Sequence, residues 1–224
     1  EDIEISGFLA ASLAWGQRPT IIRKCKELMR LMDYAPYDFI LNAQETDFER
    51  FTNFKHRTFN GYDCCYFLQA LAHIYRTKGG LEKIFTQAYQ QHQDMFQVLR
   101  CWYNEFTALP AENFQRRNIA NVEIGSAAKR VNMFLRWMVR RDASGIDFGL
   151  WKSIPPAALL IPLDLHTGNV SRNLGLLHRK QNDAQAVAEL TERLREFDPV
   201  DPIRYDFALF GLGAFAKSKE EKEY

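Results

Sequence analysis

Apolar residues recur at intervals of three and four along most of the chain, which is the spacing of amphipathic helices. Pro19 suits the first turn of one such helix, because its missing N–H would have no partner there. The pair Gly79-Gly80 separates two others. The helices predicted from this spacing cover residues 5–14, ending near Gly16, and residues 19–32, 66–75 and 81–102.

Few stretches show the alternation of apolar and polar residues that is typical of strands, so the sequence predicts an all-α fold. Residues 111–123 are polar and poorly periodic and predict a loop. Pro155-Pro156 and the segment 198–202 (Asp-Pro-Val-Asp-Pro) mark helix boundaries, since the residue before a proline disfavours helix. Residues 217–224 are charged without an apolar face and predict a frayed tail.

The composition is that of a soluble globular protein: 46% of the 224 residues are hydrophobic, and mean hydropathy is −0.35. No apolar run approaches the ~20 residues that a membrane span requires. No signal peptide is visible, although the chain begins at Glu1 and a leader could have been removed, so we expect a cytoplasmic protein. The four cysteines, Cys25, Cys64, Cys65 and Cys101, form no Cys-x-x-Cys pair and predict reduced thiols. A C-terminal iron–sulfur cluster is excluded, and no metal or other cofactor is expected.

Net charge is only +1, but basic residues gather in one part of the sequence. Between positions 116 and 141 a single acidic residue, Glu123, accompanies the residues Arg116, Arg117, Lys129, Arg130, Arg136, Arg140 and Arg141. Such a strip fits either a phosphate-binding surface or an ordinary solvated helix face.

A helix is predicted after the Gly-Ser turn of residues 125–132 (Gly-Ser-Ala-Ala-Lys-Arg-Val-Asn), with Ser126 as its N-cap. One face carries the polar residues Lys129, Asn132, Arg136 and Arg140; the opposite face, Val131, Phe134, Leu135 and Met138, is expected to pack inward. The start of a helix and partial burial both lower the pKa of a lysine, which favours the neutral amine that a nucleophile needs. The alternative is a solvent-exposed surface lysine.

Asp164 follows the apolar run of residues 159–163 and predicts the N-cap of another helix. A carboxylate in that place is fixed in direction and kept ionised by the N–H groups that it accepts from. His166 has no histidine or cysteine partner at ligand spacing, which favours a hydrogen-bonded histidine over a metal ligand. Arg172 lies two turns further on and faces either phosphate or solvent.

Residues 162–166 (Pro-Leu-Asp-Leu-His) and 172–176 (Arg-Asn-Leu-Gly-Leu) resemble the aspartate signature of helix-hairpin-helix DNA glycosylases, in which Asp164 matches the family's aspartate. Lys129 precedes it by 35 residues, an interval more similar to that of archaeal 8-oxoguanine DNA glycosylases than to that of the common members. Residues 129–142 and 198–213 resemble a bacterial family labelled domain of unknown function 2400, and that resemblance covers essentially the whole chain.

The glycosylase resemblance implies a two-lobed fold, with lobes near residues 1–128 and 129–216 and a central cleft. It also implies a monomeric, nucleoid-associated bacterial enzyme that removes a damaged base from double-stranded DNA, 8-oxoguanine by analogy. Lys129 would attack the sugar as a neutral amine and form a Schiff base, and β-elimination could then nick the strand. Asp164 would stabilise the cationic sugar.

The same resemblance suggests contacts to DNA. The residues concerned are Gly125, Ser126, Arg130, Arg136, Arg140 and Arg172, with Gln17 filling the gap left by the extruded base and His166, Asn132 and Phe210 lining the base pocket. The chain departs from the family in its hairpin, whose Leu-Pro-Gly-Val-Gly is reduced to Ile-Gly-Ser at 124–126. Two other classes stay open, namely a non-catalytic DNA-binding module and an unrelated α-helical scaffold or ligand-binding protein.

Overall fold

The computed structural model describes residues 1–110, 113–143 and 145–220, with side chains up to Ala214. Within those ranges the fold is all-α, as predicted: helices and turns account for the chain, and the only β-type pairings are isolated bridges. The chain divides into two compact units, Glu1–Ile119 and Ala120–Tyr224, which are described separately.

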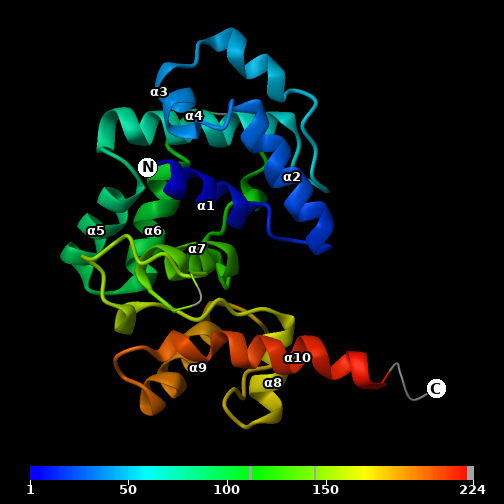
Figure 1. Cartoon of the computed structure of the whole chain (residues 1–224). Helices are drawn as coiled ribbons and strands as arrows, with labels where there is room; N and C mark the ends of the chain where they lie inside the picture. Colours follow the sequence, from blue (N-terminus) through cyan, green and yellow to red (C-terminus); the bar gives the residue numbers. More distant parts are fainter. Residues whose placement is uncertain (111–112, 144, 221–224) are drawn as a thin grey trace. The chain divides into compact units, whose positions relative to one another are not determined.

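The first unit is built around helix α4, the long helix in the upper half of Figure 1. Its core is aromatic: Phe8 meets Trp102 edge to face at 5.1 Å between ring centroids, and Phe67 meets Phe106 at 4.8 Å. All four rings are fully buried. The elements of this unit are α1 (Asp2–Ser12), α2 (Arg18–Leu31), α3 (Pro36–Asn42), η1 (Glu45–Phe51), α4 (Gly61–Lys78), α5 (Leu81–His92), α6 (Met95–Phe106) and η2 (Arg116–Asn118).

The second unit pairs helices α8 and α10, which lie side by side (Figure 1). Their close approach depends on Gly213, because a Cβ there would lie 3.0 Å from the Cβ of His166 and 3.0 Å from Cγ2 of Val170. The elements of this unit are η3 (Val122–Ile124), α7 (Lys129–Val139), η4 (Pro156–Ala158), α8 (Leu165–Asn173), α9 (Ala184–Phe197), η5 (Pro202–Tyr205) and α10 (Asp206–Glu220).

Segment 120–128 belongs to the second unit. The carbonyl of Gly125 accepts the N–H of Ala184 at 3.0 Å. Ser126 and Asp183 form an isolated antiparallel bridge beside it. The turn before α7 is therefore tied to the start of α9.

The prediction of one helix over residues 81–102 was wrong, because α5 and α6 are separate helices. Gln93 takes a left-handed backbone with φ of 52°, which ends α5. Asp94 then caps α6, its carboxylate accepting the N–H of Phe96 at 2.8 Å. A single aspartate therefore restarts the helix after a two-residue break.

Other boundaries agree with the sequence. Pro19 lies in the first turn of α2, and η4 and η5 begin at Pro156 and Pro202. Helix α10 continues to Glu220, so the first residues of the predicted frayed tail are helical, and residues 221–224 lie outside the described part.

The four cysteines are free thiols, and all of them lie in the first unit. None of the described helices is both long and apolar enough to cross a membrane. Over the same residues, no group of three or more histidine, cysteine and acidic side chains is arranged to hold a metal ion.

Candidate active site

Lys129 is the first residue of α7, and the residue before it, Ala128, takes a left-handed backbone with φ of 47° and ψ of 33°. The predicted N-cap at Ser126 was wrong, since Ala128 occupies that position and no side chain caps the helix. Ser126 instead accepts the N–H of Ala128 on its hydroxyl at 3.2 Å. The hydroxyl therefore stabilises the turn before the lysine rather than the helix itself.

Asp164 caps α8, as the sequence predicted. Its Oδ1 accepts the N–H of Thr167 at 2.9 Å. Its main-chain carbonyl accepts a hydrogen bond of 3.1 Å from the amide of Asn182, in the loop before α9. These two hydrogen bonds fix the position and direction of the Asp164 carboxylate, and they leave its Oδ2 for another partner.

The second carboxylate oxygen of Asp164 forms an ion pair with Lys129: Nζ of Lys129 lies 3.1 Å from Oδ2 of Asp164. The lysine side chain is 35% exposed and the aspartate side chain 15%. Solvent therefore reaches Lys129, whereas Asp164 is largely buried. Burial acts to raise the pKa of Asp164, but the Thr167 N–H and the Lys129 ammonium outweigh it and hold that pKa below its usual range. Asp164 is therefore ionised at neutral pH.

A second carboxyl, Asp206, lies near this pair and was not singled out in the sequence. It is the first residue of α10, is buried, and accepts a hydrogen bond from Nη1 of Arg136. Burial raises the pKa of Asp206 to about 6 against the pull of Arg136. The negative charge of Asp164 also raises the pKa of Asp206, and the positive charge of Lys129 lowers it. The one hint in the sequence is an acidic residue directly before an apolar helix.

Arg136 and Arg140 are buried in an ion-pair network, which corrects the expectation that they belong to a surface strip. Arg136 donates from Nε to Asp147 at 3.0 Å. Arg140 donates to the other oxygen of Asp147 and binds Asp201 through two hydrogen bonds of 2.8 Å each. Side-chain hydrogen bonds to Asp201 raise the pKa of Arg140 further above its ordinary value. Both guanidinium groups are occupied by carboxylates, so neither presents a free surface to phosphate.

Arg172 binds the loop that precedes α9. Its guanidinium donates to the carbonyls of Arg179 at 2.7 Å and Gln181 at 3.3 Å, and to Oδ1 of Asn182 at 2.6 Å. Asn182 also donates to the main-chain carbonyl of Asp164, so Arg172 stabilises the position of Asp164 indirectly, through Asn182.

Arg130 and the turn around Gly125 are the remaining predicted DNA contacts of this unit. Arg130 is half-buried, and burial lowers the pKa of its guanidinium to about 10. The N–H groups of Gly125 and Ser126 donate to the carbonyls of Val122 at 3.1 Å and Asn121 at 3.2 Å. Those two N–H groups are therefore used within the turn.

Of the three predicted pocket residues, the structure brings two together. His166 on α8 meets Phe210 on α10 edge to face, with 5.7 Å between ring centroids. Asn132 is buried on α7 and donates from its amide to the carbonyl of Ala127 at 3.2 Å. Gln17 lies in the first unit, exposed before α2 and without a side-chain capping bond.

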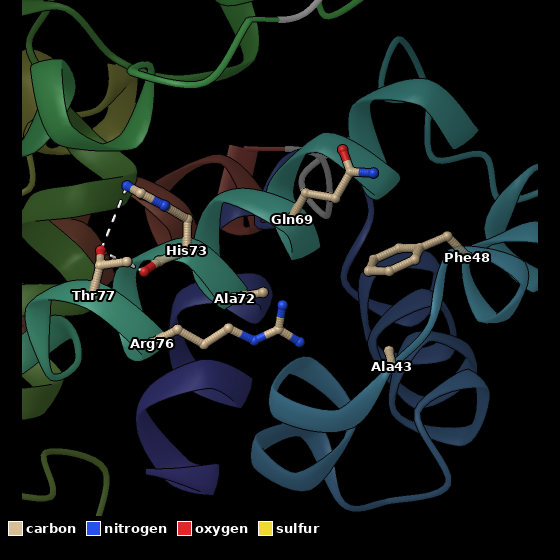
Figure 2. A pocket seen from close by; sticks show the side chains of 7 residues that line it. All are labelled: Ala43, Phe48, Gln69, Ala72, His73, Arg76 and Thr77. Carbon is tan, nitrogen blue, oxygen red and sulfur yellow. Dashed lines mark hydrogen bonds between the residues drawn. The ribbon is translucent and has the colours of Figure 1, made fainter.

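A separate hollow of about 240 Å³ lies in the first unit, between α4 and the segment that carries Ala43 and Phe48. Figure 2 shows the Phe48 ring and the Arg76 guanidinium pointing toward one another across it. Arg76 also donates to the carbonyls of Ile40 at 3.1 Å and Leu41 at 2.6 Å, near the end of α3. The lining holds no carboxylate or thiol; its polar side chains are Gln69, His73, Arg76 and Thr77.

Comparison with known families matches residues 1–215 to one family, described as protein of unknown function (DUF2400). No curated protein and no solved structure matches the chain.

Proposed function

The chain belongs to the DUF2400 family, and we propose that it is a DNA glycosylase with lyase activity that removes a damaged base through Lys129. One observation carries the proposal: the amine of Lys129 lies 3.1 Å from a carboxylate that a helix start holds ionised. In imine chemistry on a sugar, a lysine amine serves as the nucleophile and a nearby carboxylate stabilises the positive charge that develops on the sugar.

In the proposed reaction, Lys129 first loses a proton and then attacks the sugar C1′ through Nζ. The bond between C1′ and the base breaks, and the base leaves with the bonding electron pair and takes up a proton. Asp164 stabilises the positive charge on the sugar in the transition state. Opening of the sugar ring gives the Schiff base, and loss of a C2′ proton then expels the 3′ phosphate.

The resemblance of residues 162–166 and 172–176 to the aspartate signature of helix-hairpin-helix glycosylases supports this assignment. Our proposal extends to a remote membership in that superfamily, with its two-lobed fold and with 8-oxoguanine as the base by analogy to the archaeal enzymes. Within the second unit we assign Arg130 to the DNA backbone, whereas the N–H groups of the Gly125 turn already donate to Val122 and Asn121.

Borohydride trapping tests the proposal on duplexes that carry 8-oxoguanine, uracil, thymine glycol or an abasic site. We expect a covalent adduct with the unmodified protein and none with Lys129→Gln. Lys180→Gln is the matched control, because Lys180 is an exposed lysine of the same unit. An adduct of equal yield from Lys129→Gln, or no adduct on any duplex, contradicts the proposal.

The ion pair itself favours one alternative, a non-catalytic DNA-binding protein in which Lys129 links α7 to the start of α8. That protein would show binding that weakens with salt as counterions are released, but no adduct. Lys129→Gln would then reduce affinity modestly and uniformly across duplexes.

A further inference from the structure

The hollow in the first unit is open because small side chains line its centre. On α4 the lining residues are three and four positions apart, so they share one face of the helix: Gln69, Ala72, His73, Arg76 and Thr77. Ala72 is buried, and Ala43 adds a second methyl group from the end of α3. Because methyl groups stand where larger side chains would fill the space, a volume of about 240 Å³ remains.

Phe48 forms the apolar wall of the hollow (Figure 2). Its ring packs edge to face against the buried Phe39, with 5.9 Å between ring centroids. Its main-chain carbonyl accepts a hydrogen bond of 3.6 Å from the thiol of Cys65 on α4. Phe48 itself is only half-buried. The ring is therefore held in position, and part of its surface is left for an apolar ligand.

Arg76 supplies a positive charge across from this wall. Its Nη2 donates to the carbonyls of Ile40 at 3.1 Å and Leu41 at 2.6 Å, in the last turn of α3, which fixes the guanidinium. Among the described residues, Arg76 has no carboxylate partner, and its Nε and Nη1 form no hydrogen bond. Lys78, two residues further along α4, is instead paired with Glu105 at 3.1 Å. Arg76 thus keeps two donor nitrogens for a ligand.

The other polar groups of the lining add no second charge that is fixed toward a ligand. The Thr77 hydroxyl donates to the carbonyl of His73 at 2.8 Å and lies 3.5 Å from Nε2 of the same histidine. Gln69 is exposed and neutral. The hollow therefore combines an apolar wall with one unpaired cation, and a matching ligand has an apolar body and a negative charge.

Size and geometry narrow the class of ligand. A cavity of about 150 Å³ holds one benzene ring, so the larger hollow has room for a ring and one small substituent. A carboxylate is the substituent that suits Arg76, because its two oxygens lie in one plane and accept parallel hydrogen bonds from a guanidinium.

We propose that this hollow binds a small organic acid, with an aromatic or branched apolar body against Phe48 and Ala72 and its carboxylate on Arg76. The lining lies wholly in the first unit, whereas Lys129 and Asp164 belong to the second. The inference is therefore independent of the proposed function, and Lys129→Gln should bind the acid as the unmodified protein does.

Saturation-transfer NMR on the unmodified protein tests the class of ligand. The probes are benzoate, phenylacetate, hydrocinnamate and isovalerate, each measured beside the alcohol of the same carbon skeleton. We expect at least one acid to bind with a Kd of about 1 mM or below, and at least about tenfold more tightly than its alcohol. Absence of binding by every acid, or equal binding by the alcohols, overturns the proposal.

Arg76→Gln tests the contact that carries the negative charge. It should weaken binding of the acid at least about tenfold and leave the alcohol unaffected, because only the acid uses the guanidinium. Lys78→Gln is the matched control, since it removes a positive charge from the same helix outside the lining. Equal losses in both variants would indicate general attraction to a basic helix end and would overturn the site.

Filling the hollow tests its location while Arg76 is kept. Ala72→Leu should weaken binding at least about tenfold, because the larger side chain occupies the space of the ligand. Ala43→Leu fills the hollow from the other side at a half-buried position and decides alone if Ala72→Leu does not fold. Ala108→Leu, at an exposed alanine of the same unit, is the control. Full binding by a folded Ala72→Leu or by Ala43→Leu places the acid elsewhere and overturns the proposal.

Guanosine distinguishes the acid from a nucleobase. The O6 and N7 atoms of guanine also offer a guanidinium two acceptors in one plane, and the base could stack on an aromatic ring. We expect guanosine to leave the acid in place, because it carries no negative charge for Arg76. Binding of guanosine that displaces the acid from the unmodified protein, and that is lost in Arg76→Gln, would overturn the assignment to a carboxylate.

Discussion

Lys129 and Thr167 take different oxygens of the Asp164 carboxylate: the ammonium faces Oδ2 at 3.1 Å, and the main-chain N–H binds Oδ1 at 2.9 Å. The charge of the aspartate and its capping bond can therefore be removed separately, because asparagine keeps a capping oxygen and loses the charge.

We expect Asp164→Asn to unfold in urea within about 0.5 kcal/mol of the unmodified protein, since the partly exposed ion pair contributes little. Asp164→Ala should lose about 1 kcal/mol more, because the Thr167 N–H is left without its cap. Both variants should trap duplexes that still carry the damaged base at least about 100-fold more slowly, because neither offers a carboxylate to the cationic sugar that forms as the base leaves. Trapping by Asp164→Asn at the normal rate would show that the negative charge of Asp164 has no catalytic role.

Asp206 should make stability depend on pH. Its pKa is about 6 in the folded protein and about 3.9 in an unfolded chain, so the folded state binds more protons between those values. Stability from this group is therefore highest below pH 4 and falls as pH rises through 6. The difference in unfolding free energy between the unmodified protein and Asp206→Asn should shift by about 2 kcal/mol from pH 4 to pH 7, against the unmodified protein. Urea denaturation at both pH values measures it, and a constant difference would show that the carboxyl titrates normally.

Gly213→Ala should destabilise the second unit by about 1 to 3 kcal/mol, because the new methyl group would press on His166 and Val170 of α8. Gly211→Ala is the matched control: it lies in the same helix, and a Cβ there meets nothing within 4 Å. That change should raise stability by up to about 1 kcal/mol through helix propensity. Thermal denaturation of both variants tests the packing, and equal melting temperatures would contradict it.

Arg140→Gln should cost about 3 to 5 kcal/mol of stability, because it leaves the carboxylates of Asp147 and Asp201 without their common partner. Arg117 comes from the same basic stretch of sequence but is exposed. Arg117→Gln should leave the free energy of unfolding unchanged. If instead Arg140→Gln keeps full stability and only reduces the salt dependence of DNA binding, the buried network is not structural.

The sequence predicted those parts of the fold that depend on local signals. The all-α class, the first turn of α2 at Pro19 and the cap of α8 at Asp164 all follow from residues adjacent in the chain. Local signals failed at Gln93. The apolar pattern continues past this residue and predicts one helix, but the left-handed backbone of Gln93 ends α5.

The spacing of apolar and polar residues could not predict which side chains contact one another in the tertiary structure. Helical spacing placed Arg136 and Arg140 on one side of α7, but it carries no information on what packs against that side. Their main partners, Asp201 and Asp206, lie 61 and 70 residues further along the chain. For the same reason Asp206 did not stand out among 28 acidic residues until the structure placed it beside Arg136.

The peptide that leads into Lys129 is not at its conformational minimum. Ala128 has a buried methyl group and a backbone with φ of 47°, a combination that costs on the order of 1 kcal/mol and that glycine would relieve. Glycine would also open that joint to several other conformations, since it visits both halves of φ space freely. Ala128 therefore lowers stability slightly, but it restricts the direction in which the backbone enters α7 at Lys129.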